Sequence, residues 1–319
     1  MPGIGRRVSD VTAVSVRVPA KVNLQLGVGP IRDDGYHDLV NVFHAVSLFD
    51  EVTAADAPRL EVRVQAAPYS RVDVGGVPVD DGNLAAKAAR LVAARLGVEP
   101  RVAIRIRKAI PVAGGMAGGS ADAAAALVAC ARLWDDRDSP ALTRDDLVEL
   151  GAELGSDVPF AVLGGTAVGV GRGERLTPAL TRGTFHWVFA TADGGLSTPA
   201  VYAECDRIRA AEGEAAARPV VSEALMTALA TGDAKGLGAA LTNDLQAAAL
   251  SLRPSLGRVL DAGRDLGAAG ALVSGSGPTC AFLAETEEDA GDLAEALDGT
   301  GVAQQILRAQ GPVPGATVV

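Results

Sequence analysis

The stretch that decides the fold lies at residues 110–134 and reads IPVAGGMAGGSADAAAALVACARLW. Four glycines fall within six positions, and Ser120 then leads into an alanine-rich run that predicts a helix. Glycine permits positive φ and a close approach of the backbone to a ligand, and a helix N-terminus attracts anions. The same glycines also suit a turn that lets a small-residue helix pack tightly. Alone, the stretch is compatible with a phosphate site and with a packing device.

The two commonest nucleotide-binding motifs do not describe this loop. No Gly-Lys-Ser/Thr ends it, which excludes a P-loop, and the glycine spacing excludes the dinucleotide fingerprint. The strand expected just before it, RVAIRIRKAI at 101–110, alternates in polarity, whereas a central parallel strand is usually apolar throughout. This loop alone therefore does not distinguish a phosphate site from a packing device, and other segments of the chain must do so.

Composition narrows the class of protein. The chain has 319 residues, of which 48% are hydrophobic, so we expect two globular domains. The net charge is −10 and no basic run exceeds Arg6–Arg7, which argues against a nucleic-acid partner. No apolar stretch reaches the length of a membrane span or of a signal-peptide core. The widely spaced Cys130, Cys205 and Cys280 indicate neither a metal site nor a disulfide framework, and favour a cytoplasmic protein.

Local patterns predict an α+β chain in two parts. Val14, Val16 and Val18 alternate with polar residues, and the first 80 residues are mostly β. A helix begins at Asn83 or Asp81 and ends at Gly97, and a capping box opens another at 143–146. After residue 181 strands and helices alternate, with a helix break at 253–254. We therefore predict domains at 1–180 and 181–319.

Two further segments change the interpretation of the glycine loop. PAKVNL at 19–24 carries Lys21 just past a strand, and SGSGPT at 274–279 is a second glycine loop. Taken alone, Lys21 can simply extend from a strand end to solvent, and the second loop can be an ordinary connection. The three segments together, in this order, resemble the signature of the GHMP kinase superfamily of small-molecule kinases.

Other motifs indicate one family within that superfamily. The segments DDGYHD at 33–38, LGSDVPF at 154–160 and STPAVY at 197–202 resemble the 4-diphosphocytidyl-2-C-methyl-D-erythritol kinases, and the resemblance runs from Val16 to Phe282. It implies an N-terminal ribosomal-protein-S5-like domain, a C-terminal ferredoxin-like α/β-plait domain and an active site in the cleft between them. It also implies transfer of the γ-phosphoryl of ATP, with Mg²⁺, to the 2-hydroxyl of a cytidine diphosphate substrate, on the non-mevalonate route to isoprenoid precursors.

The resemblance also assigns residues to roles. Asp157 is the expected base and Lys21 its cationic partner. The expected cytidine diphosphate site comprises Asn23, Tyr36, His37, Thr198 and Tyr202, with the base stacked between the two tyrosines. The expected ATP contacts are Asn83, Lys108, Pro111, Val112, Ala113, Gly114, Gly115, Met116, Ala117, Gly118, Gly119, Ser120 and Ala121. The metal ligands are not assigned, although Asp122 is a candidate.

Each of these residues also has a purely structural interpretation. Asp157 suits the end of a helix, Lys108 a solvated strand-end lysine, and Tyr36 a packed hairpin corner. Ala113 and Ala117 stand where the family more often has glycine, and we expect a right-handed or extended backbone there because alanine disfavours positive φ.

Three alternatives remain open at this point. The chain can be a mevalonate- or homoserine-type kinase, or a non-catalytic nucleotide-binding regulator on the same fold. For the preferred kinase we expect a monomer or weak homodimer with no membrane partner.

Overall fold

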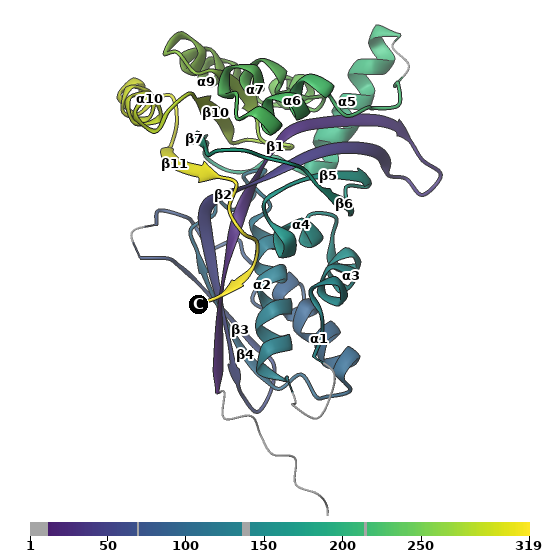
Figure 1. Ribbon diagram of the computed structural model, residues 1–319. Coiled ribbons are helices and arrows are strands. Elements are labelled where there is room, and N and C mark those ends of the chain that lie inside the picture. Colours follow the sequence, from purple (N-terminus) through teal and green to yellow (C-terminus); the bar gives the residue numbers. More distant parts are fainter. Residues whose placement is uncertain (1–11, 69, 136–140, 214–215) are drawn as a thin grey trace, which may run out of the picture.

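The computed structural model describes residues 12–68, 70–135, 141–213 and 216–319. Arg6–Arg7 and most of the segment tested for a signal peptide lie outside these residues. Two β-sheets, each accompanied by helices, make up the described part (Figure 1). The larger sheet has the order β12-β1-β2-β4-β3, with β5, β6 and β8 attached beside this path, and the smaller has the order β11-β7-β10-β9. The α+β class predicted from the sequence is confirmed.

Two long strands connect the lower and upper bodies of the molecule in Figure 1. They are β1 (Ala13–Ile31) and β2 (His37–Asp56), antiparallel from the pair Ala13–Ala55 to the pair Ile31–His37. Val14, Val16 and Val18 are buried, as their alternation predicts. From Val18 to Val28 every residue is buried, because here the strand is covered on both faces.

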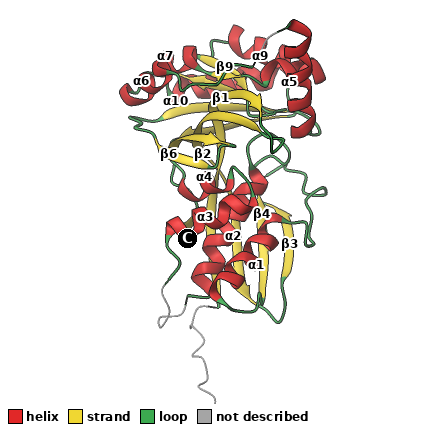
Figure 2. Cartoon of the chain, turned by 90° about the vertical axis from the view of Figure 1, so that its right-hand side faces the viewer, coloured by secondary structure: helices red, strands yellow, loops and turns green. Residues whose placement is uncertain are grey.

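The first sheet is covered on one face by four helices (Figure 2). Its other members are β3 (Glu61–Ala66), β4 (Val102–Lys108), β5 (Thr166–Gly171) and β6 (Arg175–Pro178). The helices are α1 (Leu84–Leu96), α2 (Gly118–Leu133), α3 (Arg144–Leu154) and α4 (Val158–Leu163). Asn83 caps α1, Gly97 ends it in the left-handed region, and Thr143 and Asp146 form the predicted capping box. The alanines of α2 are almost all buried, since small side chains let this helix pack closely on its neighbours.

The second sheet contains β7 (Phe185–Thr191), β9 (Gly270–Val273), β10 (Cys280–Ala284) and β11 (Gln305–Gly311). The helices of this half are α5 (Thr198–Glu212), α6 (Glu223–Thr231), α7 (Ala234–Ala240), α8 (Gln246–Leu252), α9 (Ser255–Asp265) and α10 (Glu287–Thr300). The break between α8 and α9 falls at Arg253–Pro254, as predicted.

Two short strands from the second half pair with the first sheet. They are β8 (Thr242–Asn243), parallel to β1, and β12 (Thr317–Val318), antiparallel to β1. The domain boundary at residue 180 stays a prediction. Strand β12, from the second half of the chain, belongs to the sheet of the first half.

The glycine loop departs from expectation at its two alanines. Ala113 has φ 52° and Ala117 has φ 59°, both in the left-handed region, so the predicted right-handed or extended backbone is wrong. Gly115 between them, at φ 75°, is pressed against the second loop, where an added Cβ would meet the carbonyl oxygen of Ser274 at 2.1 Å. The contact with the second loop fixes the position of Gly115. The backbone therefore adopts the left-handed conformation at Ala113 and Ala117, before and after it, and then enters α2.

This geometry makes Ala117→Gly a stabilising substitution. Left-handed backbone costs an L-residue about 1–2 kcal/mol, and the extra freedom of glycine in the unfolded chain offsets about 0.5–1 kcal/mol of that gain. We expect the free energy of unfolding, measured with urea, to rise by roughly 0.5–1 kcal/mol. The matched control is Ala131→Gly inside α2, which should lower it by about 1 kcal/mol. Equal destabilisation by both substitutions would contradict the left-handed assignment of Ala117.

Candidate active site

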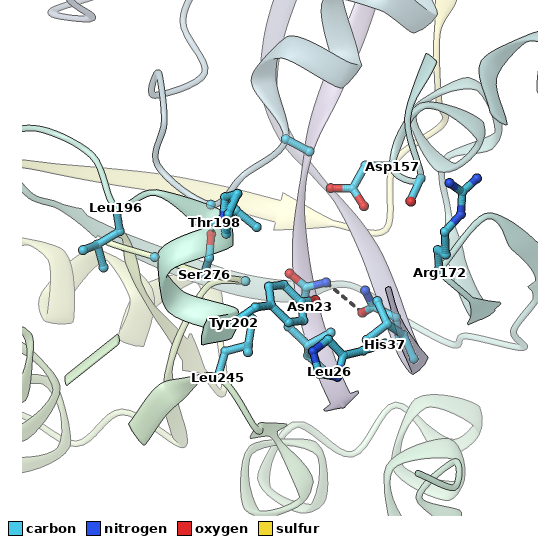
Figure 3. A pocket seen from close by; sticks show the side chains of 18 of the residues that line it. Asn23, Leu26, His37, Asp157, Arg172, Leu196, Thr198, Tyr202, Leu245 and Ser276 are labelled. Carbon is cyan, nitrogen blue, oxygen red and sulfur yellow. Dashed lines mark hydrogen bonds between the residues drawn. The ribbon is translucent and has the colours of Figure 1, made fainter. Parts of the chain in front are cut away.

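A cavity of about 730 Å³ is lined by residues from both halves of the chain (Figure 3). Strand β1 and the hairpin after it supply one wall, and the glycine loop with the start of α2 supplies another. Residues 156–157, α5 and residues 275–277 complete it. The segments that the sequence singled out therefore surround one space.

The three signature segments meet at the backbone of Gly115. Its carbonyl oxygen accepts a hydrogen bond from Lys21 Nζ at 2.8 Å and one from Ser274 Oγ at 3.2 Å. The backbone N–H of Thr279 donates to the neighbouring carbonyl of Gly114 at 3.4 Å. Only glycine suits position 115, because it combines positive φ with no space for a Cβ.

The glycine loop forms a cradle at one end of the cavity. Helix α2 begins at Gly118, so the N–H groups of its first turn lack partners within the helix and stand at the positive end of its dipole. The predicted contacts that line the cavity are Ala113, Gly114, Gly115, Ala117, Gly118, Gly119 and Ser120. Pro111, Val112, Met116 and Ala121 do not line it, and the last two are buried in the core beneath the loop.

Lys108 lies beneath the cradle in a buried ion cluster. Its ammonium donates to Asp122 Oδ2 at 2.7 Å, to the Gly118 carbonyl at 3.2 Å and to Asp50. The residue is 2% exposed, so the solvated interpretation is wrong, and it does not line the cavity. Burial lowers the pKa of Lys108, but the carboxylates of Asp122 and Asp50 outweigh burial and raise it. The lysine is therefore held in its charged form.

The ion cluster connects both ends of the glycine loop. Asp50 Oδ1 accepts the backbone N–H of Ala109 at 2.6 Å and that of Ile110 at 2.9 Å, where the loop begins. Burial raises the pKa of Asp122 well above its usual value, while Lys108 opposes this shift. The Asp122 carboxylate faces the cluster and not the cavity, so its expected role as a metal ligand is not supported.

Asn83 likewise serves the fold at this position. Its Oδ1 accepts the N–H of Ala85 at 2.8 Å, its amide donates to the Pro78 carbonyl at 2.6 Å, and it does not line the cavity. Two of the predicted nucleotide contacts, Asn83 and Lys108, are thus committed to interactions within the protein.

Lys21 and Asp157 both line the cavity. Lys21 Nζ donates to Asn23 Oδ1 at 2.6 Å as well as to Gly115, and Asn23 in turn donates to Asn41 at 2.7 Å. Burial lowers the pKa of Lys21, and the charge of Asp157 opposes the shift. Asp157 opens α4 without a side-chain capping bond, so its carboxylate is not used as a cap.

The aromatic residues lie toward another part of the cavity (Figure 3). His37 stacks on Tyr202 with ring centroids 5.3 Å apart, and the Arg172 guanidinium lies 5.1 Å from the centroid of Tyr36, which is 55% exposed. The two tyrosines line the same cavity without being paired with each other. Thr198 also lines it, and its Oγ1 lies 2.9 Å from Ser276 Oγ.

Sequence reasoning missed Ser156, Arg172, Ser276 and Asp206 among the lining residues. Asp206 follows Tyr202 by four positions on α5, a spacing that places both on one helix face and that the sequence already contained. Arg172 follows β5 immediately, and only the strand pairing brings it to Tyr36.

Two expectations from the composition concern the cysteines and membrane-spanning segments. The three cysteines are free and buried. Over the residues described, no helix combines the length and apolar character needed to cross a membrane.

Comparison with known proteins shows which family this chain resembles. The family descriptions "GHMP kinases N terminal domain" and "GHMP kinases C terminal" match residues 83–165 and 225–303. A 4-diphosphocytidyl-2-C-methyl-D-erythritol kinase of Thermobifida fusca is 60% identical over 97% of this chain and 99% of its own length. The enzyme of the same name from Streptomyces avermitilis is 56% identical over 96% of this chain and 100% of its own length.

A solved structure agrees with these sequence relatives. The crystal structure of a 4-(cytidine 5'-diphospho)-2C-methyl-D-erythritol kinase has a TM-score of 0.72 and 34% identity, over 92% of this chain and 98% of that one. The expected two-domain GHMP kinase fold is thereby confirmed. The likeness extends over nearly the whole chain, including every signature segment, and the chain belongs to the 4-diphosphocytidyl-2-C-methyl-D-erythritol kinase family of the GHMP kinases.

Proposed function

We propose that this chain transfers the γ-phosphoryl group of ATP to the 2-hydroxyl of 4-diphosphocytidyl-2-C-methyl-D-erythritol, giving the 2-phosphate and ADP for isoprenoid synthesis. One observation carries the proposal: Lys21 and the 274–279 loop both bind the backbone of Gly115 in the glycine loop. These segments line the same cavity as Asp157. The names of its relatives supply the substrate. We further propose that it acts in the cytoplasm as a monomer or weak homodimer.

The triphosphate is assigned to the cradle at 113–120. Phosphoryl transfer needs positioning and charge stabilisation more than covalent chemistry from the protein. Backbone N–H groups at the start of α2 and the Ser120 hydroxyl supply donors to the phosphate oxygens. The ion cluster of Lys108, Asp50 and Asp122 holds the loop in this shape from beneath.

Magnesium is expected to arrive with the triphosphate. Mg²⁺ in such sites is held by one or two protein oxygen ligands together with substrate phosphates and water. The Ser120 hydroxyl and the Asp157 carboxylate offer oxygen ligands among the residues that line the cavity. When bound, the ion neutralises charge on the phosphates.

Asp157 is proposed to orient and deprotonate the 2-hydroxyl. A carboxylate that is free of capping bonds and faces the cavity can accept this proton. Lys21 lies close enough to interact electrostatically with Asp157, and its cation favours the ionised carboxylate and the developing charge on the phosphoryl oxygens. Asn23 positions the lysine by accepting its hydrogen bond.

The cytidine end of the substrate is assigned to the aromatic end of the cavity. The rings of Tyr36 and Tyr202 offer stacking surfaces there, and His37 and Thr198 offer polar contacts. Tyr36 is exposed enough to close over a base, whereas Tyr202 is largely covered by its neighbours. Stacking tolerates any base, so selection of cytosine requires hydrogen bonds in addition.

Asp157→Asn should lower kcat by about 100-fold or more, because an amide cannot accept the hydroxyl proton. The measurement is ADP production from ATP with the cytidyl substrate, with mevalonate and homoserine as comparison substrates. Asp265→Asn, an exposed carboxylate at the end of α9, is the control and should match the parent protein. Near-parental turnover in folded Asp157→Asn would remove this residue from the role of base.

Lys108→Met should lower the free energy of unfolding by about 3–5 kcal/mol, because Asp50 and Asp122 would be left buried without their counter-ion. Lys87→Met, on the exposed side of α1, is the matched control and should change it by less than about 0.5 kcal/mol. A Lys108→Met protein as stable as the parent, with a raised KM for ATP only, would show that Lys108 contacts the nucleotide directly.

A further inference from the structure

We propose that Asn243 is a positioning residue for the reaction, because its side-chain amide holds the 274–279 loop against Lys21 and the carbonyl of Gly115. The inference rests on the proposed function, since it takes Lys21 to stabilise the charge that develops during phosphoryl transfer. No signature segment of the sequence contains Asn243, and its side chain does not line the cavity. Its effect on the reaction must therefore pass through other residues.

The 274–279 loop is in direct contact with the lysine. Ser274 Oγ donates to the Gly115 carbonyl, the same oxygen that accepts a hydrogen bond from Lys21 Nζ. Gly275 has φ 57°, and a Cβ added there would lie 3.1 Å from Lys21 Nζ and 3.0 Å from the Gly115 oxygen. The backbone of Gly275 is therefore part of the wall that confines the ammonium group. If the loop moved away, the ammonium group would be free to change its position.

Asn243 binds this loop at two backbone carbonyls. Its Nδ2 donates to the Val273 oxygen at 2.7 Å and to the Gly275 oxygen at 2.7 Å, so both amide protons are used. Its Oδ1 accepts the backbone N–H of Leu245 at 2.9 Å. The two carbonyls belong to the residues before and after Ser274, so the amide fixes the chain on both sides of this serine. An amide can make all three bonds at once, whereas a carboxylate can make only the bond to Leu245.

Asn243 is itself attached to the strand that carries Lys21. Strand β8 runs parallel to β1 and places Asn243 opposite Leu26 of β1. The backbone N–H of Asp244 donates to the Leu26 carbonyl at 2.9 Å. Strand β1 therefore carries the lysine and, through β8, also the residue that holds the loop against it. This connection sets the position of the loop relative to Lys21.

The position of the lysine matters more in the transition state than for binding of ATP. An ammonium group stabilises developing charge only if it is in place before the charge appears. A small displacement of a catalytic group can lower a rate by about 100-fold. The phosphates of ATP are assigned instead to backbone N–H groups at the start of α2. Loss of the Asn243 bonds should therefore lower kcat and leave KM for ATP almost unchanged.

The test measures ADP production from ATP and the cytidyl substrate in two variants. Asn243→Asp keeps the shape and the bond to Leu245 but loses both donors, while Asn243→Ser introduces no charge and keeps a hydroxyl that can accept from Leu245. In each folded variant kcat should fall about 10- to 100-fold, and KM for ATP should change by less than about threefold. Thr242→Ala, at the exposed neighbouring position on β8, is the control and should keep the parental kcat.

A second measurement separates positioning from a purely structural role. Lys21→Met should lower kcat by itself. Adding Asn243→Asp to Lys21→Met should lower the remaining kcat by less than about twofold, because residues that act as a unit do not have additive effects. An equal loss in both backgrounds would overturn the inference, since Asn243 would then act on the fold and not through the lysine.

Failure of the inference can be told from failure of the proposed function. If Asn243→Asp and Asn243→Ser keep the parental kcat while Lys21→Met is impaired, the inference is overturned and the proposed function stands. If the parent protein does not phosphorylate the cytidyl substrate, or if Lys21→Met keeps the parental kcat, the proposed function or the role of Lys21 falls, and the inference falls with it.

Discussion

The carbonyl group of Gly115 is the point on which the site depends. It accepts hydrogen bonds from Lys21 and Ser274, which come from opposite ends of the chain, and it lies at the centre of the glycine loop. No side chain fits at this residue, because the second loop presses on it. One backbone group thus binds Lys21, the cation proposed to serve the reacting hydroxyl. The same group lies in the cradle proposed for the phosphates and joins the two halves of the protein through Ser274.

The cradle is held from beneath as well as from above. Beneath it, Lys108 and two aspartates bind the start of the loop and the first turn of α2 in a cluster closed to solvent. A buried ion cluster contributes little net stability compared with an apolar core, but removing one member leaves uncompensated charge. Its value here is geometric, because phosphoryl transfer depends on donors that are positioned before the substrate binds. The left-handed alanines at 113 and 117 indicate that the loop keeps this shape at a cost in backbone energy.

The sequence predicted the fold, and most of the residues that it singled out line one cavity, because these features depend on local patterns. Strand alternation, helix caps and the three signature segments are each readable over a few residues, and Lys21, Asp157 and both tyrosines reach the cavity as expected. The features that the sequence did not predict involve contacts between segments far apart in the chain. Lys108 is neutralised by Asp50, 58 residues away, and Arg172 reaches Tyr36 only through strand pairing. The backbone of Ala117 was mispredicted because local preference opposes what the contact at Gly115 imposes.

The most direct measurement is a crystal structure of the chain with a non-hydrolysable ATP analogue and 4-diphosphocytidyl-2-C-methyl-D-erythritol. Our account predicts the triphosphate along residues 113–120, with the 2-hydroxyl within about 2.6–3.2 Å of the Asp157 carboxylate. A triphosphate bound away from this loop, or a 2-hydroxyl directed away from Asp157, would contradict it.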